Sequence, residues 1–316
     1  MRELSCFGDG SVSVAAAAAS VSGRGALDRA LQAATTSVYR AVLSSGKEML
    51  VRVTWTRSAA GAPGVAVAFD DGGANSSDAP KPSPPPERTR PVLLLHKRRG
   101  SRTLVTGAGT AVGVHWDTTE AKYASGSSSP EPERDYCLAV VADAELALLL
   151  GTGGAARELS RRLGLAPGAR AAPALLVSRR EQLRCAAAAH VTRCRFREGG
   201  DEHEVAVHAC RGGDEGELRV TIDGEKVAEV RRVGWGFRGN RAAVLADGEV
   251  VDVMWDVHDW WFGGRGGGGS SSAGSGAQFM VKARAEKEGR LWMADDTAAR
   301  GQSPGGFFLH VQCYRR

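Results

Sequence analysis

Hydrophobic and polar residues alternate along many short stretches of this chain. A Val, Leu, Ile, Phe or Trp occupies every second position in 51–55, 65–69, 112–116, 218–222 and 251–255. A period of two is typical of strands that place one face on a core. The Asp-Gly pairs at 223–224 and 247–248 each lie between two apolar runs, which predicts β-hairpins. The pattern therefore predicts an all-β, antiparallel protein of about 14 short strands.

A few segments depart from this alternation. The apolar runs 136–142 and 145–150 are more continuous and are predicted as central strands joined by a tight turn. One short helix is predicted at 154–165, where three Leu accompany three Arg. Segments rich in Gly, Ser or Pro are predicted as loops: 70–91, 124–134, 263–276 and 294–306.

One stretch of the chain recurs 139 residues later. Residues 99–117 and 238–256 are identical at nine of 19 positions without a gap, and both contain a Trp-Asp pair. A looser match relates 51–56 to 205–210 and 65–71 to 218–224. We infer two copies of one β unit, in which the shared residues serve the structure of each copy.

The repeat and the loops together predict the domain organisation. Each unit is expected to be an antiparallel sandwich or open barrel. The first unit, with seven strands before a helix, also resembles a pleckstrin-homology arrangement, which stays an alternative. The predicted segments are an Ala/Ser-rich and largely unstructured N-terminus (1–35), the first β unit (36–150), a connecting helix and strand (151–187), the second β unit (188–293, with a flexible loop at 263–276) and a C-terminal tail (294–316).

Composition and charge exclude several classes of protein. Hydrophobic residues make up 42% of the chain, which is enough for a core, and the 41 Gly residues are clustered rather than periodic as in collagen. A run of about 18 apolar residues, as in a membrane-spanning helix, is absent from the sequence. The net charge of +5 permits an acidic partner without requiring one.

The cysteines and the N-terminus bear on the compartment. The six Cys residues are scattered without a CxxC pair, so we expect reduced thiols rather than a disulfide scaffold or a zinc site. The apolar run at 12–22 is a weak secretion signal because it lacks Leu and follows the acidic residues Glu3 and Asp9. We expect an intracellular protein, cytoplasmic or nuclear and not secreted. Its Ala and Ser content leaves plastid import open.

Several short motifs follow one another along nearly the whole chain. The most specific are Phe-Arg-Gly-Asn at 237–240 and Trp-Asp-Val-His-Asp-Trp at 255–260. Others are Lys-Arg-Arg-Gly-Ser at 97–101, Ala-Lys-Tyr at 121–123, Ser-Arg-Arg-Glu at 178–181 and Gln-Phe-Met at 278–280. In this order they resemble the plant-specific family called domain of unknown function 868. The resemblance implies a land-plant protein and brings no established activity. The Gly/Ser insert at 263–276 and the Pro-rich stretch at 80–91 depart from the family pattern.

The basic loop is the first candidate site. It places Lys97, Arg98, Arg99 and Arg102 within six residues, and its copy keeps Arg238. Such a loop is either a solvated hairpin or a site for an anionic lipid or a phosphate. Nucleic acid is not expected, because exposed aromatic residues interleaved with the cations are only weakly represented.

The segment 251–261 is the second candidate. As a strand it would place Asp252, Asp256 and His258 on one face with Trp260, where carboxylates and an imidazole could hold a metal ion or transfer protons. The matching copy keeps only the Trp-Asp pair. The alternative is structural: the Trp fills the core, and the Asp accepts hydrogen bonds from a turn just after the strand.

Two further groups carry weaker signals. The motif at 178–181 lies between the two units and could form an ion pair that fixes their orientation, or contact a partner. His208 and Cys210 share one face of a predicted strand that begins near His203, but they lack the spacing of a metal site. Nucleophile, zinc-protease and phosphate-loop motifs are missing from the sequence, so we expect no catalytic residue, metal site or cofactor.

These observations predict a non-catalytic binding or scaffold protein with a protein partner. One alternative is a module that binds anionic lipid or phosphate through the loop 97–102, with Arg238, Asp256 and His258 as further ligand contacts. A second alternative is a metal-dependent enzyme that uses Asp252, Asp256 and His258.

Overall fold

The computed structural model of the protein describes residues 31–71, 92–124, 128–162, 164, 174–185, 188–210, 216–262, 276–284 and 307–315. These residues form 17 strands in three sheets and three short helices. The largest sheet has nine strands, in the order β14 (Arg238–Val244), β15 (Val250–Asp256), β16 (Gly276–Ala283), β17 (Phe308–Arg315), β9 (Leu175–Cys185), β1 (Leu31–Val42), β2 (Glu48–Ser58), β3 (Pro63–Asp70) and β4 (Val92–Leu94).

The other two sheets have four strands each. One contains β5 (Arg99–Val105), β6 (Ala111–Asp117), β7 (Tyr136–Ala142) and β8 (Glu145–Thr152). The other contains β10 (Ala188–Cys194), β11 (His203–Cys210), β12 (Glu217–Ile222) and β13 (Glu225–Val230). The helices are α2 (Gly153–Arg162), α3 (Val233–Gly236) and α4 (His258–Phe262). Among the described helices, none is long and apolar enough to span a membrane.

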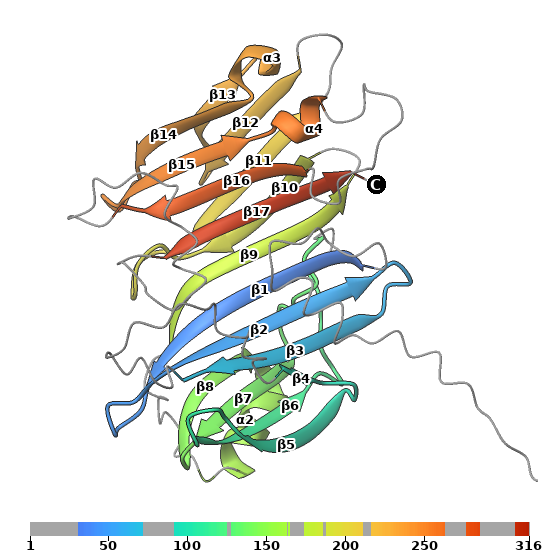
Figure 1. The fold of residues 1–316 in the computed structure, drawn as a ribbon, viewed down its shortest axis with the longest axis vertical. Coiled ribbons are helices and arrows are strands. Elements are labelled where there is room, and N and C mark those ends of the chain that lie inside the picture. The colour runs from blue at the N-terminus through green and yellow to red at the C-terminus, as the bar shows by residue number, and fades with distance from the viewer. Residues whose placement is uncertain are drawn as a thin grey trace, which may run out of the picture.

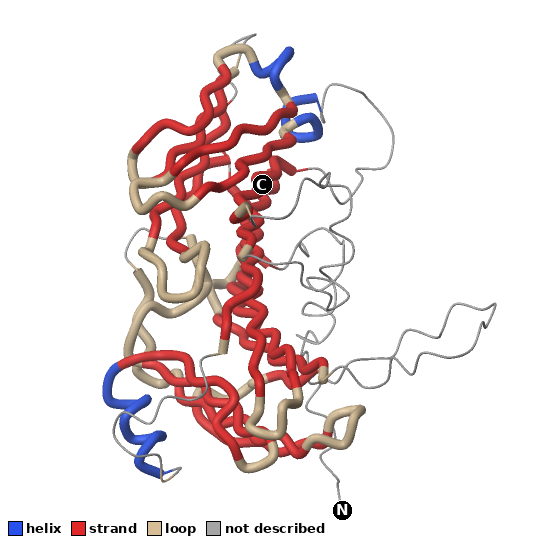
Figure 2. The backbone as a smooth tube through the Cα atoms, turned by 90° about the vertical axis from the view of Figure 1, so that its left-hand side faces the viewer, coloured by secondary structure: helices blue, strands red, loops and turns tan. Residues whose placement is uncertain are grey.

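The nine-stranded sheet runs through both halves of the molecule (Figure 1). Its neighbouring strands are antiparallel, except that β17 pairs with β9 in parallel. Figure 2 shows both four-stranded sheets on the same side of it, one at each end. We call β1–β4 with β5–β8 the first sandwich, and β9 and β14–β17 with β10–β13 the second sandwich.

Each sandwich has its own apolar core. In the first, Val53 and Trp55 of the large sheet pack with Val114 and Leu138 of the small sheet. In the second, the large sheet contributes residues such as Val253 and Phe279, and the small sheet contributes residues such as Val207 and Leu218. These are the alternate positions of strands with period two, so the buried faces follow directly from the sequence pattern.

A polar seam separates the two cores on the shared sheet. On one face of β1, Ala33 belongs to the second core and Tyr39 belongs to the first, with Thr35 and Ser37 between them. Glu181 of β9 lies beside Thr35 in the register. The period of two therefore continues through β1, while a change from apolar to polar residues marks where one core ends and the next begins.

Glu181 is the centre of this seam. Its carboxylate, which is 1% exposed, accepts hydrogen bonds from Arg179, from Thr192 at 2.7 Å and from His190. Arg179 also reaches Glu131 at 2.6 Å. Burial raises the pKa of Glu181, but Arg179 and the hydrogen bonds of His190 and Thr192 outweigh it and lower this pKa to about 2. The predicted ion pair at 178–181 is thus present between Arg179 and Glu181, at the joint of the two sandwiches.

The predicted all-β class is confirmed, and several predicted elements are found. The Asp-Gly pairs join β12 to β13 and β14 to β15, and Gly224 and Gly248 take φ values of 81° and 84° that suit glycine in tight turns.

The predicted helix corresponds to α2. It packs Ala156 and Leu159 on Cys137 and Ala139, which lie on the outer face of β7. Helix α2 therefore covers the outer face of the sheet β5–β8 and forms a surface layer on the first sandwich.

Three expectations about strands are wrong. The run 145–150, predicted as a central strand, lies in the edge strand β8, and its outer apolar residues Leu146 and Leu149 are covered by α2. The strand near 251–261 ends at Asp256, and His258 and Trp260 belong to α4, because Asp256 Oδ1 accepts the backbone N–H of His258 at 3.0 Å and starts a turn. The predicted tail 294–316 contains β17, an interior strand, whose Leu309, Val311 and Cys313 alternate with polar residues. The predicted N-terminal segment lies outside the described residues except for 31–35, which are not unstructured but begin β1. The predicted loops 70–91, 263–276 and 294–306 lie largely or wholly outside them, whereas only 125–127 of the predicted loop 124–134 does.

Candidate functional site

The hairpins β5–β6 and β14–β15 have the same register. In each, an Arg lies opposite an Asp and the next residue, a Gly, lies opposite a Trp: Arg99–Asp117 and Gly100–Trp116 in one, Arg238–Asp256 and Gly239–Trp255 in the other. The turns also agree, since Thr106 N–H bonds to Thr110 O and Leu245 N–H bonds to Glu249 O. The two hairpins are therefore one local structure used twice.

The Trp residues of both hairpins are structural. Trp116 Nε1 donates to Lys97 O at 2.7 Å, and Trp255 Nε1 donates to Gly236 O at 3.0 Å. Each indole lies flat on the opposing Gly: a Cβ added there would come within 2.7 Å of Trp116 or 2.2 Å of Trp255. A side chain at either position would collide with the ring, which explains the Gly-Trp pairing in both copies.

The Asp residues of both hairpins cap turns. Asp117 Oδ1 accepts the backbone N–H of Thr119 at 3.0 Å, as Asp256 does for His258. Asp256 Oδ2 also accepts a hydrogen bond from Arg238 Nε at 2.8 Å. Arg238 and Asp256, both predicted as ligand contacts, therefore form an ion pair with each other. Asp252 is likewise paired with Arg284, and His258 Nδ1 lies 2.9 Å from Asp259.

The candidate residues do not form one site. Lys97, Arg98, Arg99 and Arg102 lie on and beside β5, an edge strand of the first sandwich, while Arg238 lies on β14 at the far end of the molecule (Figure 1). All four cations near β5 are exposed. The two candidate groups must therefore be considered as separate surfaces.

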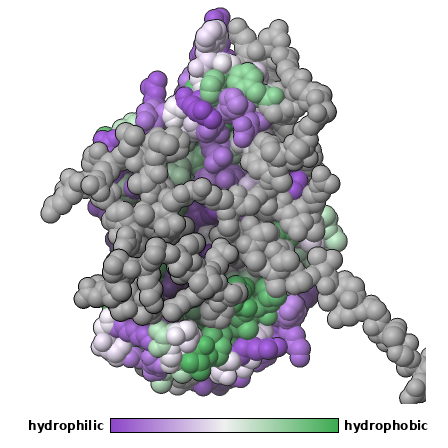
Figure 3. Space-filling view, in the orientation of Figure 1, coloured by the Kyte–Doolittle hydropathy of each residue, from purple (hydrophilic) through white to green (hydrophobic). Residues whose placement is uncertain are grey.

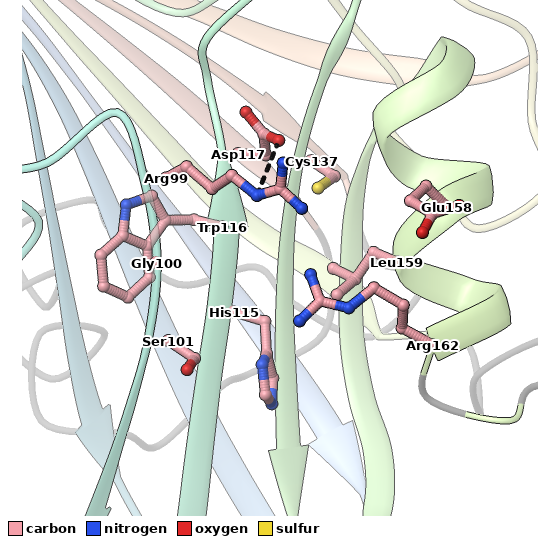
Figure 4. Close-up of a pocket in the computed structure, with 10 residues that line it drawn as sticks. All are labelled: Arg99, Gly100, Ser101, His115, Trp116, Asp117, Cys137, Glu158, Leu159 and Arg162. Carbon is pink, nitrogen blue, oxygen red and sulfur yellow. Dashed lines mark ion pairs between the residues drawn. The ribbon is translucent and has the colours of Figure 1, made fainter.

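A small pocket of about 180 Å³ opens beside Arg99, between β5–β7 and α2. Figure 4 shows the guanidinium groups of Arg99 and Arg162 reaching into it from opposite sides, with His115 between the strands and the helix. Burial and the nearby Arg162 lower the pKa of His115, so its imidazole is neutral at pH 7. Asp117 and Glu158 also line the pocket; Asp117 lies 3.5 Å from Arg99, and Glu158 pairs with Arg161.

The second sandwich carries a different surface at the equivalent place. Trp235, on α3, is 92% exposed. Beside it in the chain, Phe237 makes ring contacts with His258 at 5.2 Å and Phe262 at 5.5 Å between centroids, and Arg238 lies over the Phe237 ring at 5.7 Å. We call Trp235, Phe237, Arg238, His258 and Phe262 the aromatic surface. Figure 3 shows hydrophobic colouring at this upper end of the molecule, where α3 and α4 lie.

The same positions differ in the first sandwich. With the offset of 139 residues, Trp235, Phe237, His258 and Phe262 correspond to His96, Arg98, Thr119 and Tyr123. The framework of Gly, Trp, Asp and Arg is thus common to both hairpins, while Trp235 and Phe237 of the second sandwich are replaced by His96 and Arg98 in the first.

A family model for plant proteins of unknown function, DUF868, matches residues 30–310. The chain belongs to the DUF868 family. The match covers both sandwiches and agrees with the resemblance drawn from the motifs. A search of curated proteins and a search of solved structures find no significant match.

Side chains of the types that bind metals do not gather in this DUF868 member where the second candidate site predicts. Among the described residues, Asp252, Asp256 and His258 do not bring their ligand atoms together, whereas His203 lies with Asp247 and Glu249. His203 faces the core from β11, while His208 and Cys210 lie on the opposite face of that strand. An alternation pattern can separate these faces, but it cannot show which distant turn meets His203.

The sequence also fails to predict parts of the pocket beside Arg99 and of the aromatic surface. In the DUF868 chain, Arg162 joins Arg99 only because α2 folds back onto β7, and Phe262 joins Phe237 only because α4 follows β15. The available signal for the aromatic surface is the correspondence of Tyr123 with Phe262 at the repeat offset.

Proposed function

We propose that this protein is a non-catalytic binding protein whose second sandwich engages a protein partner through the aromatic surface. The observation that carries this proposal is Trp235, a large indole left 92% exposed to solvent. Exposed Trp, Phe and Arg side chains are the types that dominate binding energy at protein interfaces. Phe262, also exposed, and the ring contacts of Phe237 extend this surface.

The charges around the aromatic surface indicate the chemistry of the partner. Arg231 and Arg238 are both more than half exposed, and Arg241 of β14 is exposed as well. Asp256 pairs with Arg238, and Glu229 lies 3.8 Å from Arg231, so these two charges are partly offset at the protein surface. A protein segment that presents an apolar side chain flanked by carboxylates would complement both the rings and the cations.

The test compares proximity labelling in plant cells by the full chain, its Trp235→Ala variant and the matched variant His96→Ala. We expect labelling of a subset of proteins to fall several-fold with Trp235→Ala and to stay unchanged with His96→Ala. A purified protein from that subset should then bind Trp235→Ala at least about 30-fold more weakly, as for an interface hot spot. Labelling that is the same for all three chains would overturn the proposal.

A second candidate function rests on the pocket beside α2. There Arg99 and Arg162 converge, so the basic loop at 97–102 could hold a phosphate group of a lipid or a free phosphate. Anionic vesicles and inorganic phosphate distinguish the two sources. Binding should fall steeply with salt and be lost when Lys97, Arg98 and Arg99 are changed to Ala. Unchanged binding by that variant would exclude this function.

We also propose that the two sandwiches are copies of one β unit, the predicted units 36–150 and 188–293, with β9 and β17 of the second sandwich lying outside the predicted range. The nine identities between 99–117 and 238–256 coincide with equal strand registers and equal turn hydrogen bonds. The shared Gly and Trp residues support the fold of each hairpin, and the exposed residue at the position of Trp235 is His96 in the first sandwich. This division of roles is what a duplicated binding scaffold would have.

A further inference from the structure

A corner of the second sandwich brings together three ligand groups from distant parts of the chain. His203 begins β11, and Asp247 and Glu249 lie in the turn between β14 and β15. One ligand atom from each of the three lies within 4.8 Å of the others. The corner joins the four-stranded sheet of β10–β13 to the nine-stranded sheet, so a group bound there would contact both sheets.

Each of the three side chains has one polar atom engaged and one directed into the corner. His203 Nδ1 donates to Asp223 Oδ2 at 2.7 Å, which leaves Nε2. Asp247 Oδ1 accepts the N–H of Glu249 at 3.1 Å, which leaves Oδ2. Glu249 Oε1 pairs with Arg197 Nε at 2.8 Å, which leaves Oε2. Each side chain is thus oriented by one contact and presents its second atom at the same point.

The three remaining atoms are buried without a hydrogen bond. Within the described part of the chain, His203 Nε2, Asp247 Oδ2 and Glu249 Oε2 have no hydrogen-bond partner. Asp247 Oδ2 has only the longer ion-pair contacts, with His203 Nε2 at 3.5 Å and Arg197 Nη2 at 3.6 Å. The His203 and Asp247 side chains are only 4% and 8% exposed. Leaving such buried polar groups unsatisfied is unfavourable, and more so for charged groups. Three of them converging is the arrangement that a bound cation would satisfy.

The charge of the corner suits a divalent ion. Asp223, Asp247 and Glu249 carry three negative charges, and Arg197 offsets one of them. Burial lowers the pKa of His203, but its hydrogen bond to Asp223 and the charges of Asp223 and Asp247 outweigh burial and raise this pKa. A cation would therefore displace the proton from Nε2, and the Asp223 carboxylate would orient the ring as carboxylates orient metal-bound histidines. Two uncompensated carboxylates match a charge of +2.

The first sandwich has the same corner with different chemistry. There Asp71 accepts hydrogen bonds from the hydroxyl groups of Thr106 and Thr110, and Lys47 Nζ reaches Thr110. Thr110 occupies the position of Glu249 in the other hairpin. A Lys ammonium therefore supplies the positive charge in the first corner, and none of the side-chain atoms of these four residues is among the buried, unpartnered atoms of the described chain.

We propose that the second corner is a metal site, in which His203 Nε2, Asp247 Oδ2 and Glu249 Oε2 bind one divalent transition-metal ion such as Zn²⁺ or Mn²⁺. The mixed nitrogen and oxygen donors favour these ions over Mg²⁺, which takes oxygen ligands. The ion would clip the two sheets of the second sandwich together. This site is independent of the aromatic surface, so the two proposals can fail separately.

The test uses the full chain, purified, stripped with a chelator and titrated with ZnCl₂, MnCl₂ or MgCl₂. We expect one Zn²⁺ or Mn²⁺ per chain by elemental analysis and calorimetry, a rise in Tm of several degrees on binding, and weaker binding of Mg²⁺. Glu249→Gln keeps the shape of the side chain and should weaken binding at least tenfold. Glu217→Gln, the same change at a partly exposed carboxylate on β12, should bind as the original chain does.

Three results would overturn the metal site. The first is the absence of stoichiometric binding, with no change in Tm, for the unaltered chain with all three salts. The second is equal affinity of Glu249→Gln and the unaltered chain, which would place any bound ion elsewhere. The third is an imidazolium at His203 that bridges Asp223 and Asp247 and does not release its proton. NMR of the metal-free chain would then show protons on both ring nitrogens, and these protons would persist when Zn²⁺ is added.

Discussion

Gly239 lies directly beneath the indole of Trp255, so close that a Cβ at Gly239 would come within 2.2 Å of the ring. The same contact recurs between Gly100 and Trp116. Because the obstacle is a ring anchored by its own N–H hydrogen bond, it cannot move aside as a flexible side chain would.

This contact predicts the effect of a single methyl group. Gly239→Ala should destabilise the protein by about 1–3 kcal/mol, the usual cost of overpacking. Gly107→Ala is the control, because a Cβ there meets nothing within 4 Å. Urea unfolding should show a lower midpoint for the first variant and a change within about 0.5 kcal/mol for the second. Equal midpoints for Gly239→Ala and Gly107→Ala would mean that the Trp255 ring shifts to make room for the added methyl group.

The Trp residues should divide into two classes by stability. Trp235→Ala should change the free energy of unfolding by less than about 0.5 kcal/mol, since the side chain is exposed. Trp255→Ala should cost about 3–5 kcal/mol, since it empties part of a core. Thermal and urea unfolding measure both. A large loss for Trp235→Ala would show that it packs against the fold and would remove the basis of the aromatic surface.

Breaking the polar seam should weaken the joint between the sandwiches. Glu181→Gln leaves Arg179 buried with only Glu131 as an ion-pair partner, so we expect a loss of about 3–5 kcal/mol. Glu217→Gln breaks a surface pair with Arg219 and should cost at most about 1 kcal/mol. Calorimetry would show whether the two halves of Glu181→Gln then unfold in separate transitions. A single transition at the original Tm would contradict the role of Glu181 in stabilising the joint between the two sandwiches.

The same carboxylate predicts a dependence of stability on pH. The pKa of Glu181 is about 2 in the folded chain against an ordinary value of 4.5. Its contribution is complete above pH 4.5 and is lost as the pH falls toward 2, because the unfolded chain takes up the proton first. The difference amounts to about 3 kcal/mol. Urea midpoints between pH 6 and pH 2.5 should fall less steeply for Glu181→Gln than for the original chain.

Thiol reactivity provides a further measurement on the native chain. Burial raises the pKa of Cys194 to about 12 and also raises that of Cys137. Cys210 is only partly buried. Since the thiolate is the reactive form, an alkylating reagent should modify Cys210 well before Cys194 or Cys137. Peptide mapping by mass spectrometry at pH 8 gives the order, and early modification of Cys194 would contradict the burial of β10 against the core.

The local pattern of the chain is sufficient for the strands and the hairpins. Val251, Val253 and Trp255 alternate with polar residues, and the Asp-Gly turns follow the backbone preferences of those two residues. The same pattern is present in 308–314, where Leu309, Val311 and Cys313 mark β17, although the Gly- and Pro-containing stretch before it suggests a tail. The repeat of 139 residues likewise indicates that Trp116 and Trp255 have equivalent places, and the two registers agree with this.

Local pattern could not show how the two sandwiches join or which residues meet between distant segments. The parallel pairing of β17 with β9, the seam around Glu181 and the meeting of His203 with Asp247 each connect residues far apart in the sequence. Such contacts depend on which sheet edges pair and on which loops reach the same corner. Alternation fixes the face on which a side chain lies, because it is a property of neighbouring residues. The partner across a sheet or between sheets is decided by the packing of the whole molecule.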